Sequence, residues 1–414
     1  FKQRPINNAS EIELGLNNLL SPEKFKGIDD AVSLLVKALE EQQRVLVVAD
    51  FDADGATSCV VAIDCLRKFG LKQIDYVVPN RFEYGYGLTP EIVELGKLKN
   101  PDIIITVDNG ISSVEGVATA NNAGISVIIT DHHLAPSALP AAEAILNPNQ
   151  LGCDFPSKCI AGVGVIFYLM LALRIRLRAL DWFDKTGIRE QNLADQLDLV
   201  ALGTIADVVP LDRNNRILVD EGLKRIRKGK TRPGIDALIN ISDRQRVHLK
   251  ASDVGYGLAP RLNAAGRLED MSTGIECLLS TSESEAYQLA LSLDGINKDR
   301  KKLEADMREQ AWQALDELSG QYENLPNTLC LFDERWHQGI VGLIASRVKD
   351  KYHRPTIAFA QVDDGKEIKG SARSVKGFHI RDALDIVATK NPGLIDKYGG
   401  HAMAAGLSLK KQNF

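Results

Sequence analysis

Three apolar runs in the first third of the chain are each followed at once by acidic residues or histidines. The segments that follow them are Asp50-Phe-Asp-Ala-Asp-Gly55, Asp108-Asn-Gly110 and Asp131-His-His133. Carboxylate oxygens with one or two imidazoles suit Mn²⁺ or Mg²⁺ better than a structural zinc. Carboxylates gathered at one place would repel one another unless cations lay among them. The pattern therefore predicts two cations roughly 3.5–4 Å apart that share a bridging carboxylate and activate a water.

Each motif taken alone also has an ordinary structural interpretation. The first resembles a calcium loop but lacks the later glutamate of an EF-hand. An aspartate after a strand is often only a helix cap, and Asp108-Asn-Gly110 could be a turn. A histidine pair is commonly structural or solvated. The occurrence of all three motifs at successive strand ends favours the metal site.

The elements that would position these residues alternate between strand and helix. We expect strands at 44–49, 73–78, 102–107 and 125–130, and helices at 56–69 and 112–123. The strands are apolar on both faces, as in a covered parallel sheet. The alternation predicts an α/β fold with a mostly parallel, doubly wound sheet, whose ligands lie beyond the carboxyl ends of the strands.

Composition sets the broad class of the protein. Of 414 residues, 44% are hydrophobic and 25% charged, and the net charge is −5. These values exclude a disordered, collagen-like or coiled-coil chain. They argue against a general basic coat for nucleic acid, although a local basic groove remains open. No apolar run reaches the roughly 18 residues of a membrane helix, so we expect no membrane association. Six cysteines without a CxxC pair indicate a reducing, cytoplasmic location.

A long polar helix predicted at 282–320 divides the chain into two domains. The larger domain, 1–281, carries the acidic motifs. The smaller domain, 321–414, is also α/β, with strands expected near 328–332 and 356–360 and a helix near 339–349.

The motifs resemble those of a known family. Together with Gly203-Thr-Ile-Ala-Asp-Val-Val-Pro-Leu211, the three acidic segments resemble the four ordered motifs of the DHH phosphoesterases. Further segments resemble the RecJ family of single-strand-specific 5′→3′ exonucleases within that superfamily. They are Pro79–Leu88, Ala259–Arg267, Trp336–Gly342 and Gly399–Gly406. The resemblance covers essentially the whole chain.

The resemblance implies specific ligands for two divalent cations, Mn²⁺ or Mg²⁺. One cation would be held by Asp52 and Asp108, with Asp50 in support, and the other by Asp54, Asp108, His132 and Asp207. His133 would face the scissile phosphate, and Asp131 would orient the histidines. Many family members carry a histidine ligand two residues before the first aspartate, where this chain has Val48. The first cation would then be bound more weakly or with more water.

The C-terminal domain resembles the DHHA1 domain, which implies phosphate recognition. Its signature segments are Gly370-Ser-Ala-Arg-Ser374 and Gly399-Gly-His401. Ser371, Arg373 and His401 would contact phosphate oxygens, because Arg offers a planar fork of donors and glycines let backbone N–H groups approach. A plain turn is the alternative for Gly399-Gly400.

Other residues would contact the substrate by the same resemblance. Arg81 resembles a 5′-phosphate contact, and Arg261, Asn263 and Arg267 would position the strand backbone or form a surface salt-bridge network. The basic runs at 224–232 and 298–302 either track nucleic acid or are solvated helix surfaces. Tyr84, Tyr86 and Trp336 either stack on bases or pack in the core.

The family implies a single-strand-specific 5′→3′ exonuclease that releases 5′-mononucleotides in DNA repair and recombination. Its substrate would be single-stranded DNA with a 5′ end, with a single-strand-binding protein and a helicase as further partners and a monomeric state. RecJ-like proteins usually continue into an OB-type domain. Two alternatives stay open: a DHH-type short-oligonucleotide phosphodiesterase or pyrophosphatase, and a scaffold that binds single strands without cutting them.

Overall fold

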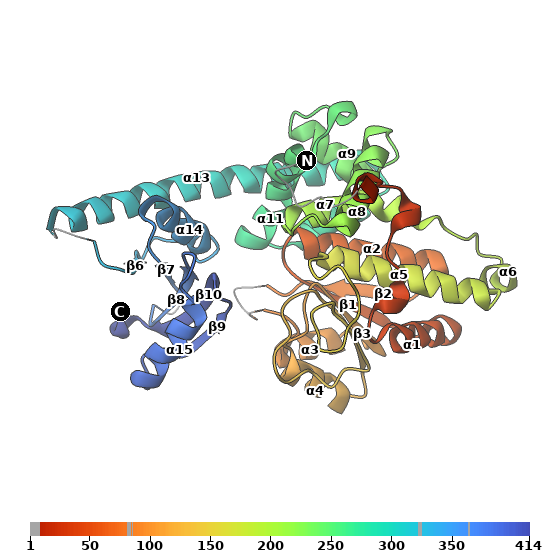
Figure 1. Ribbon diagram of the computed structural model, residues 1–414, viewed down its shortest axis with the longest axis horizontal. Helices are drawn as coiled ribbons and strands as arrows, with labels where there is room; N and C mark the ends of the chain where they lie inside the picture. The colour runs from red at the N-terminus through yellow and green to blue at the C-terminus, as the bar shows by residue number, and fades with distance from the viewer. Residues whose placement is uncertain (1–8, 81–83, 85, 322–324, 363–364) are drawn as a thin grey trace. The chain divides into compact units, whose positions relative to one another are not determined.

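The computed structural model describes residues 9–80, 84, 86–321, 325–362 and 365–414, without the side chains of 9–10 and 317–321. The chain divides into two compact units, Phe1–Ile296 and Asn297–Phe414, and each is described by itself (Figure 1). Over the described residues, no helix has the length and apolar character needed to cross a membrane.

The first unit is built on a parallel sheet with the strand order β2-β1-β3-β4-β5. Its strands are β1 (Val45–Ala49), β2 (Ile74–Val77), β3 (Ile103–Val107), β4 (Ser126–Thr130) and β5 (Ala144–Leu146). The predicted doubly wound α/β fold is confirmed. The sequence missed β5, because three residues are too short to give a pattern.

Helices make up the rest of the first unit. They are α1 (Ile28–Glu41), α2 (Ala53–Phe69), α3 (Pro90–Lys97), α4 (Val114–Asn122), α5 (Gly162–Ala179), α6 (Trp182–Thr186), α7 (Leu197–Ala206), α8 (Arg213–Arg227), α9 (Pro233–Ile241), α10 (Ala251–Asp253), α11 (Ala259–Leu268) and α12 (Ser272–Leu279). A π-helix, η6 (Val254–Leu258), joins α10 to α11.

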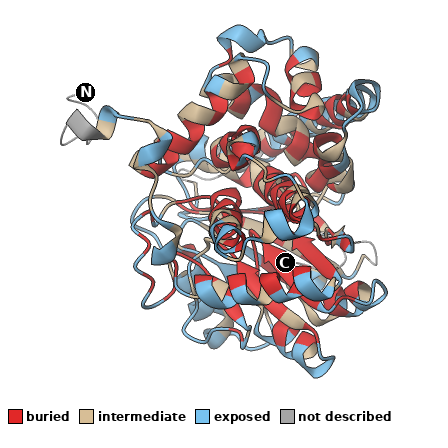
Figure 2. Ribbon diagram, turned by 90° about the vertical axis from the view of Figure 1, so that its right-hand side faces the viewer, coloured by how far each residue is buried: buried red, intermediate tan, exposed pale blue. Residues whose placement is uncertain are grey.

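Both faces of this sheet are covered, as the apolar strands predicted. Alternate residues of β1 point to opposite faces. Val45 and Val47 join a core with α1, α2 and α5, whereas Leu46 and Val48 join a second core with α3 and α4. Figure 2 shows buried residues concentrated along the strands and the inner sides of the helices. The site residues at the strand ends therefore stand on a rigid, dry sheet.

The second unit contains a mixed sheet with the order β6-β7-β8-β10-β9, in which only β6 and β7 pair in parallel. Its strands are β6 (Leu329–Phe332), β7 (Thr356–Gln361), β8 (Glu367–Arg373), β9 (Lys397–Gly400) and β10 (Ala404–Lys410), and its helices are α14 (Val341–Tyr352) and α15 (Ile380–Lys390). A small core under the sheet includes Phe359, Ile368 and Leu407.

The long helix predicted at 282–320 is α13 (Glu283–Gln321). Its first half buries Ala286, Ala290 and Leu293 in the core of the first unit. Further along, Met307 and Ala311 are buried within the second unit. Each half of the helix buries only a narrow apolar stripe. Most of its residues are polar for this reason.

Candidate active site

The carboxyl ends of β1, β3 and β4 carry the predicted metal ligands. β1 runs into Asp50 and Asp52, β3 into Asp108, and β4 into Asp131-His-His133. Because these strands are parallel neighbours, the three loops meet at one edge of the sheet. Asp207 reaches the same place from the C-cap of α7. One proposed ligand therefore comes from a helix end and those named above from the loops after the strands.

The ligand atoms form three overlapping groups, and within each group all atoms lie within 4.8 Å of one another. The groups are Asp50 with Asp52 and Asp108, Asp54 with His132 and Asp207, and Asp108 with His132 and His133. His132 Nε2 lies 3.1 Å from Asp108 Oδ1 and 3.4 Å from Asp207 Oδ2. Oxygen and imidazole donors in this number and spacing fit two divalent cations.

Asp54 is the most deeply fixed of these carboxylates. It stands in the first turn of α2, and the N-cap residue Asp52 accepts its backbone N–H. Its own carboxylate accepts the N–H groups of Gly162, at 2.7 Å, and Val163, at 3.0 Å, where α5 begins. Burial raises the pKa of Asp54 well above its usual value, and the charges of Asp207 and Asp52 raise it further. A bound cation would remove this electrostatic cost.

Asp108 is held in an unusual backbone conformation. Its φ of 62° lies in the left-handed region, which directs its carboxylate toward the neighbouring loops. Its Oδ1 atom is buried and accepts no hydrogen bond from the described residues, although His132 Nε2 lies 3.1 Å away. A buried, unpaired carboxylate oxygen is costly unless something binds it. This orphaned atom is the observation that best fits a bridging metal ligand.

Glycine is required where α5 begins. A Cβ atom on Gly162 would lie 2.5 Å from Asp108 Oδ1. The backbone can approach both Asp108 and Asp54 only because this side chain is absent. Sequence reasoning did not identify this residue as part of the site, because the only local signal is a glycine at the start of an apolar helix.

The two histidines are held in opposite charge states. Burial lowers the pKa of His132 to about 4, and the charge of His133 contributes. His132 is therefore the neutral imidazole that a metal ligand must be. Burial also lowers the pKa of His133, but the hydrogen bond and charge of Asp131, at 2.7 Å from Nδ1, outweigh it and bring the pKa to about 9. His133 therefore carries a positive charge at neutral pH.

Asp131 organises the histidine loop. Burial would raise its pKa, but the hydrogen bond and charge of His133 hold it below the usual range. Its two oxygens also accept the backbone N–H groups of Ile111, at 2.9 Å, and His132, at 2.7 Å. Asp131 is thus saturated with donors and orients the loop rather than binding a cation itself.

Tyr86 is a neighbour that the sequence assigned to base stacking or to the core. Its hydroxyl donates to the carbonyl of Asp108 at 3.2 Å and lies 3.3 Å from His133 Nδ1. Its ring meets the rings of His133 and Phe51 edge-on. These contacts place Tyr86 as a support for His133.

In the second unit, Ser371 and Arg373 lie together on β8. Arg373 Nη1 donates to Ser371 Oγ at 3.0 Å. A Cβ atom on Gly342 would lie 2.9 Å from Arg373 Nη2 and 3.0 Å from Ser371 Oγ, so the first turn of α14 comes close to both. Guanidinium, hydroxyl and backbone N–H groups are the donors that a phosphate needs.

His401 lies in the turn between β9 and β10 and is exposed. Its N–H donates to the carbonyl of Ala404 at 2.7 Å. Gly399 and Gly400, for which a plain turn was the alternative, form the end of edge strand β9.

Two family models match this chain: the DHH family N-terminal domain over residues 44–204, and the DHHA1 domain over residues 325–414. The single-stranded-DNA-specific exonuclease RecJ of Dickeya dadantii is 52% identical over 414 residues, which is 100% of this chain and 72% of that protein. The chain belongs to the RecJ family.

Solved RecJ structures have the same fold. A RecJ exonuclease bound to manganese is 31% identical, with a TM-score of 0.78, and the match covers 95% of this chain and 92% of that one. RecJ from Thermus thermophilus in complex with Mg²⁺ is 28% identical, with a TM-score of 0.71, over 97% of this chain and 52% of that one.

Val48 occupies the position at which the resemblance led us to expect a histidine ligand. Val48 is fully buried and packs with Val77, Ile104 and Ile129 in the core beneath α3 and α4. Its side chain fills that core, and it has no donor to offer a cation.

Two of the residues predicted to contact the backbone of the DNA strand have partners within the protein. Arg261 pairs with Asp294 of α13 at 2.8 Å and also donates to the carbonyl of Ile241. Asn263 Oδ1 accepts the N–H of Ala53 at 2.8 Å and so supports the first turn of α2. Arg267 lies nearby on α11 and is partly exposed. Asn263 thus supports the first turn of α2, which carries Asp54, whereas Arg261 ties α11 to α13 and to the end of α9.

Several members of the basic runs, and one of the aromatic residues, have partners within the fold. Lys224 pairs with Asp220, Arg232 with Asp198, and Arg300 with Glu304. Trp336 is only 5% exposed and donates to Gln310, so the core interpretation holds for it. Arg81 lies outside the described residues.

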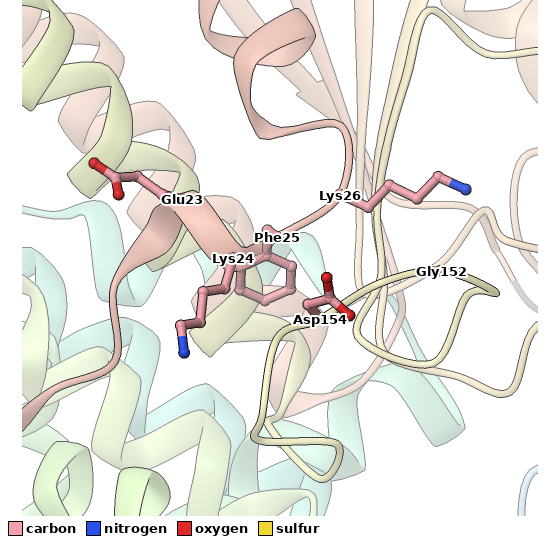
Figure 3. Close-up of a pocket in the computed structure, with 6 residues that line it drawn as sticks. All are labelled: Glu23, Lys24, Phe25, Lys26, Gly152 and Asp154. Carbon is pink, nitrogen blue, oxygen red and sulfur yellow. The ribbon is translucent and has the colours of Figure 1, made fainter.

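A surface hollow of about 460 Å³ lies where the segments 23–26 and 152–154 meet (Figure 3). It is lined by Glu23, Lys24, Phe25, Lys26, Gly152 and Asp154. Figure 3 shows the side chains of Glu23, Lys24 and Lys26 extending in different directions rather than toward one point. No predicted site residue lines it, and it does not compete with the metal centre.

Proposed function

We propose that this chain hydrolyses single-stranded DNA from the 5′ end and releases 5′-mononucleotides, as an enzyme of DNA repair and recombination. Curated RecJ relatives at 50% to 53% identity over 414 residues are single-stranded-DNA-specific exonucleases. The observation that carries the proposal is Asp108 Oδ1, a buried atom that accepts no hydrogen bond from the described residues, on a residue shared by two of the ligand groups.

The chain's own residues prepare the reaction. Two divalent cations, Mn²⁺ or Mg²⁺, would supply Lewis-acid activation of the phosphate and of the attacking water when bound. In our proposal Asp50, Asp52 and Asp108 hold one cation, and Asp54, Asp108, His132 and Asp207 hold the other. The positive charge of His133 stabilises negative charge that develops on the phosphate. Asp131 keeps His133 charged and in place.

Further residues complete the proposed site at the 5′ end of the strand. Arg81, Ser371, Arg373 and His401 would bind the 5′-phosphate. The Arg373–Ser371 pair supports this assignment, because its donors are already arranged together on one strand. Arg261, Asn263 and Arg267 would act at the strand backbone, and Asn263 would also act through the first turn of α2, which it supports at Ala53.

The wider setting stays part of the proposal. We divide the chain into a DHH catalytic domain at 1–281, a connecting helix at 282–320 and a DHHA1 domain at 321–414. We expect a monomer in the cytoplasm that works with a single-strand-binding protein and a helicase.

Product analysis tests the function directly. A single strand carrying a 5′-phosphate label and a different 3′ label is incubated with Mn²⁺. Prompt release of labelled 5′-mononucleotide, while the 3′ label stays on long fragments, supports the proposal. Cleavage restricted to dinucleotides or pyrophosphate would assign the chain to the small-substrate DHH enzymes instead. Asp108→Asn, which preserves the side-chain shape, serves as the control and should abolish release.

A further inference from the structure

Val208 has a backbone conformation that its side chain disfavours. It directly follows Asp207 at the end of α7, and its φ is 60°. In the left-handed region a β-branched residue is a clear outlier, because Cβ crowds the following carbonyl. Helices commonly end with this conformation, but the residue there is usually glycine or asparagine. A valine at this position needs an explanation.

Core packing does not provide that explanation. The side chain of Val208 is 84% exposed. Its N–H donates to the carbonyl of Ile205 at 3.3 Å, a bond that any residue except proline would make. The chain therefore holds an apolar side chain in water and in a strained conformation, at the position next to a proposed metal ligand. Strain of this kind gathers at functional sites.

A second irregularity lies against the same end of α7. The π-helix η6 contains Gly255, and a Cβ atom added there would lie 3.4 Å from Ile205 Cγ2. The next residue, Tyr256, is 83% exposed. Helices of the π type are rare and occur often at functional sites. The end of α7 and the π-helix η6 meet at Ile205. The first exposes the side chain of Val208, and the second exposes that of Tyr256.

We propose that Val208 contacts the base of the nucleotide held at the metal centre. The inference rests on the proposed exonuclease function. Asp207 directly precedes Val208, and its Oδ2 atom lies 3.4 Å from His132 Nε2, so Val208 adjoins a residue that in the proposed function would hold a cation at the phosphate to be cut. An isopropyl group offers no donor to a phosphate, and the large apolar surface of a nucleotide is its base. Such a contact is indifferent to base identity, which suits an exonuclease that must remove every nucleotide.

Two substitutions separate the side chain's contact from its strain. Val208→Gly removes both, so it should raise the melting temperature by about 2 °C and raise KM on a normal 5′-phosphorylated strand about tenfold. Val208→Thr keeps the shape and the strained backbone, so it should leave the melting temperature unchanged and raise KM less. His353→Gly is the matched control. His353 also ends a helix with a positive φ, 52°, but it follows α14 in the second unit and adjoins no proposed metal ligand. The His353→Gly variant should have a higher melting temperature than the wild-type protein and the same KM and kcat.

The decisive substrate has abasic residues at its 5′ end. The wild-type protein should degrade it more slowly than a normal strand, and Val208→Gly should cause no further loss on it. An unchanged KM of Val208→Gly on the normal strand would overturn the inference, as would equal losses on both strands. Failure of the wild-type protein to release 5′-mononucleotides from a normal strand would instead refute the proposed function, so the two failures are distinguishable.

Discussion

Replacing a metal ligand should stabilise the metal-free protein, and Asp207→Asn is the substitution that tests this. Burial raises the pKa of Asp207 from 3.8 to about 7, and the charge of Asp52 adds to the effect. The carboxyl group is thus more easily ionised in the unfolded chain than in the folded one. The metal-free protein therefore loses stability as the pH rises from about 4 to about 7, and Asn, which does not ionise, avoids that loss.

The size of the effect follows from the shift. The difference between 3.8 and about 7 is about 3 pKa units, which at 1.36 kcal/mol per unit is about 4 kcal/mol. The side chain is 26% exposed, so solvent screens it only in part. Asp54 and Asp108 take up protons in the same cluster, and their protonation relieves some of the repulsion on Asp207. The expected gain from Asp207→Asn at pH 8 is therefore about 2 kcal/mol.

Urea unfolding in EDTA measures this gain. The variant should exceed the wild-type protein in unfolding free energy at pH 8 and match it at pH 4. Adding Mn²⁺ should reverse the order at pH 8, because the wild-type protein gains binding energy that the variant has lost. A variant less stable than the wild-type protein in EDTA at pH 8, or a gain that is the same at both pH values, would refute the electrostatic argument.

Three further substitutions test other parts of the site. Gly162→Ala should lower kcat about a hundredfold with little change in unfolding free energy, because its Cβ would displace Asp108 Oδ1 from 2.5 Å away; wild-type turnover would show that the loop adapts. Asp131→Asn should move the alkaline limb of the kcat–pH profile to lower pH, since Asp131 holds the pKa of His133 up at about 9; an unmoved limb would exclude His133 as the titrating group. Arg261→Met should cost about 3 kcal/mol in urea unfolding by removing a charged partner of the buried Asp294; unchanged stability with a raised KM would make Arg261 a substrate contact instead.

The sequence was informative wherever a single element carries a whole motif. The strands before Asp50, Asp108 and Asp131 could be read from their apolar runs, and a parallel sheet brings its strand ends together without further information. Asp207 could be found only through family resemblance, because it lies on a helix whose approach to the sheet depends on tertiary packing.

The contributions that sequence reasoning missed come from backbone groups and from packing. The N–H groups of Gly162 and Val163 that hold Asp54 have no sequence signature beyond an apolar helix start. Asn263 was predicted as a substrate contact, and the sequence did not show that its oxygen also accepts a hydrogen bond from Ala53, more than two hundred residues away in the chain. Side-chain type predicts what a residue can bind; only the fold determines whether its partner is internal.

The two strained residues suggest how this metal centre keeps its shape without its cations. Asp108 and Val208 both have left-handed φ values, 62° and 60°, and both stand at the ends of elements with buried cores, β3 and α7. Valine in particular disfavours that conformation, and aspartate adopts it only in a minority of cases, so we infer that the packing of β3 and α7 imposes it. The ligand loops are then set before a cation arrives, and binding energy is not used to order them. Relaxing either strain should therefore weaken function while strengthening the fold, which is the opposite of what loss of ordinary packing would do.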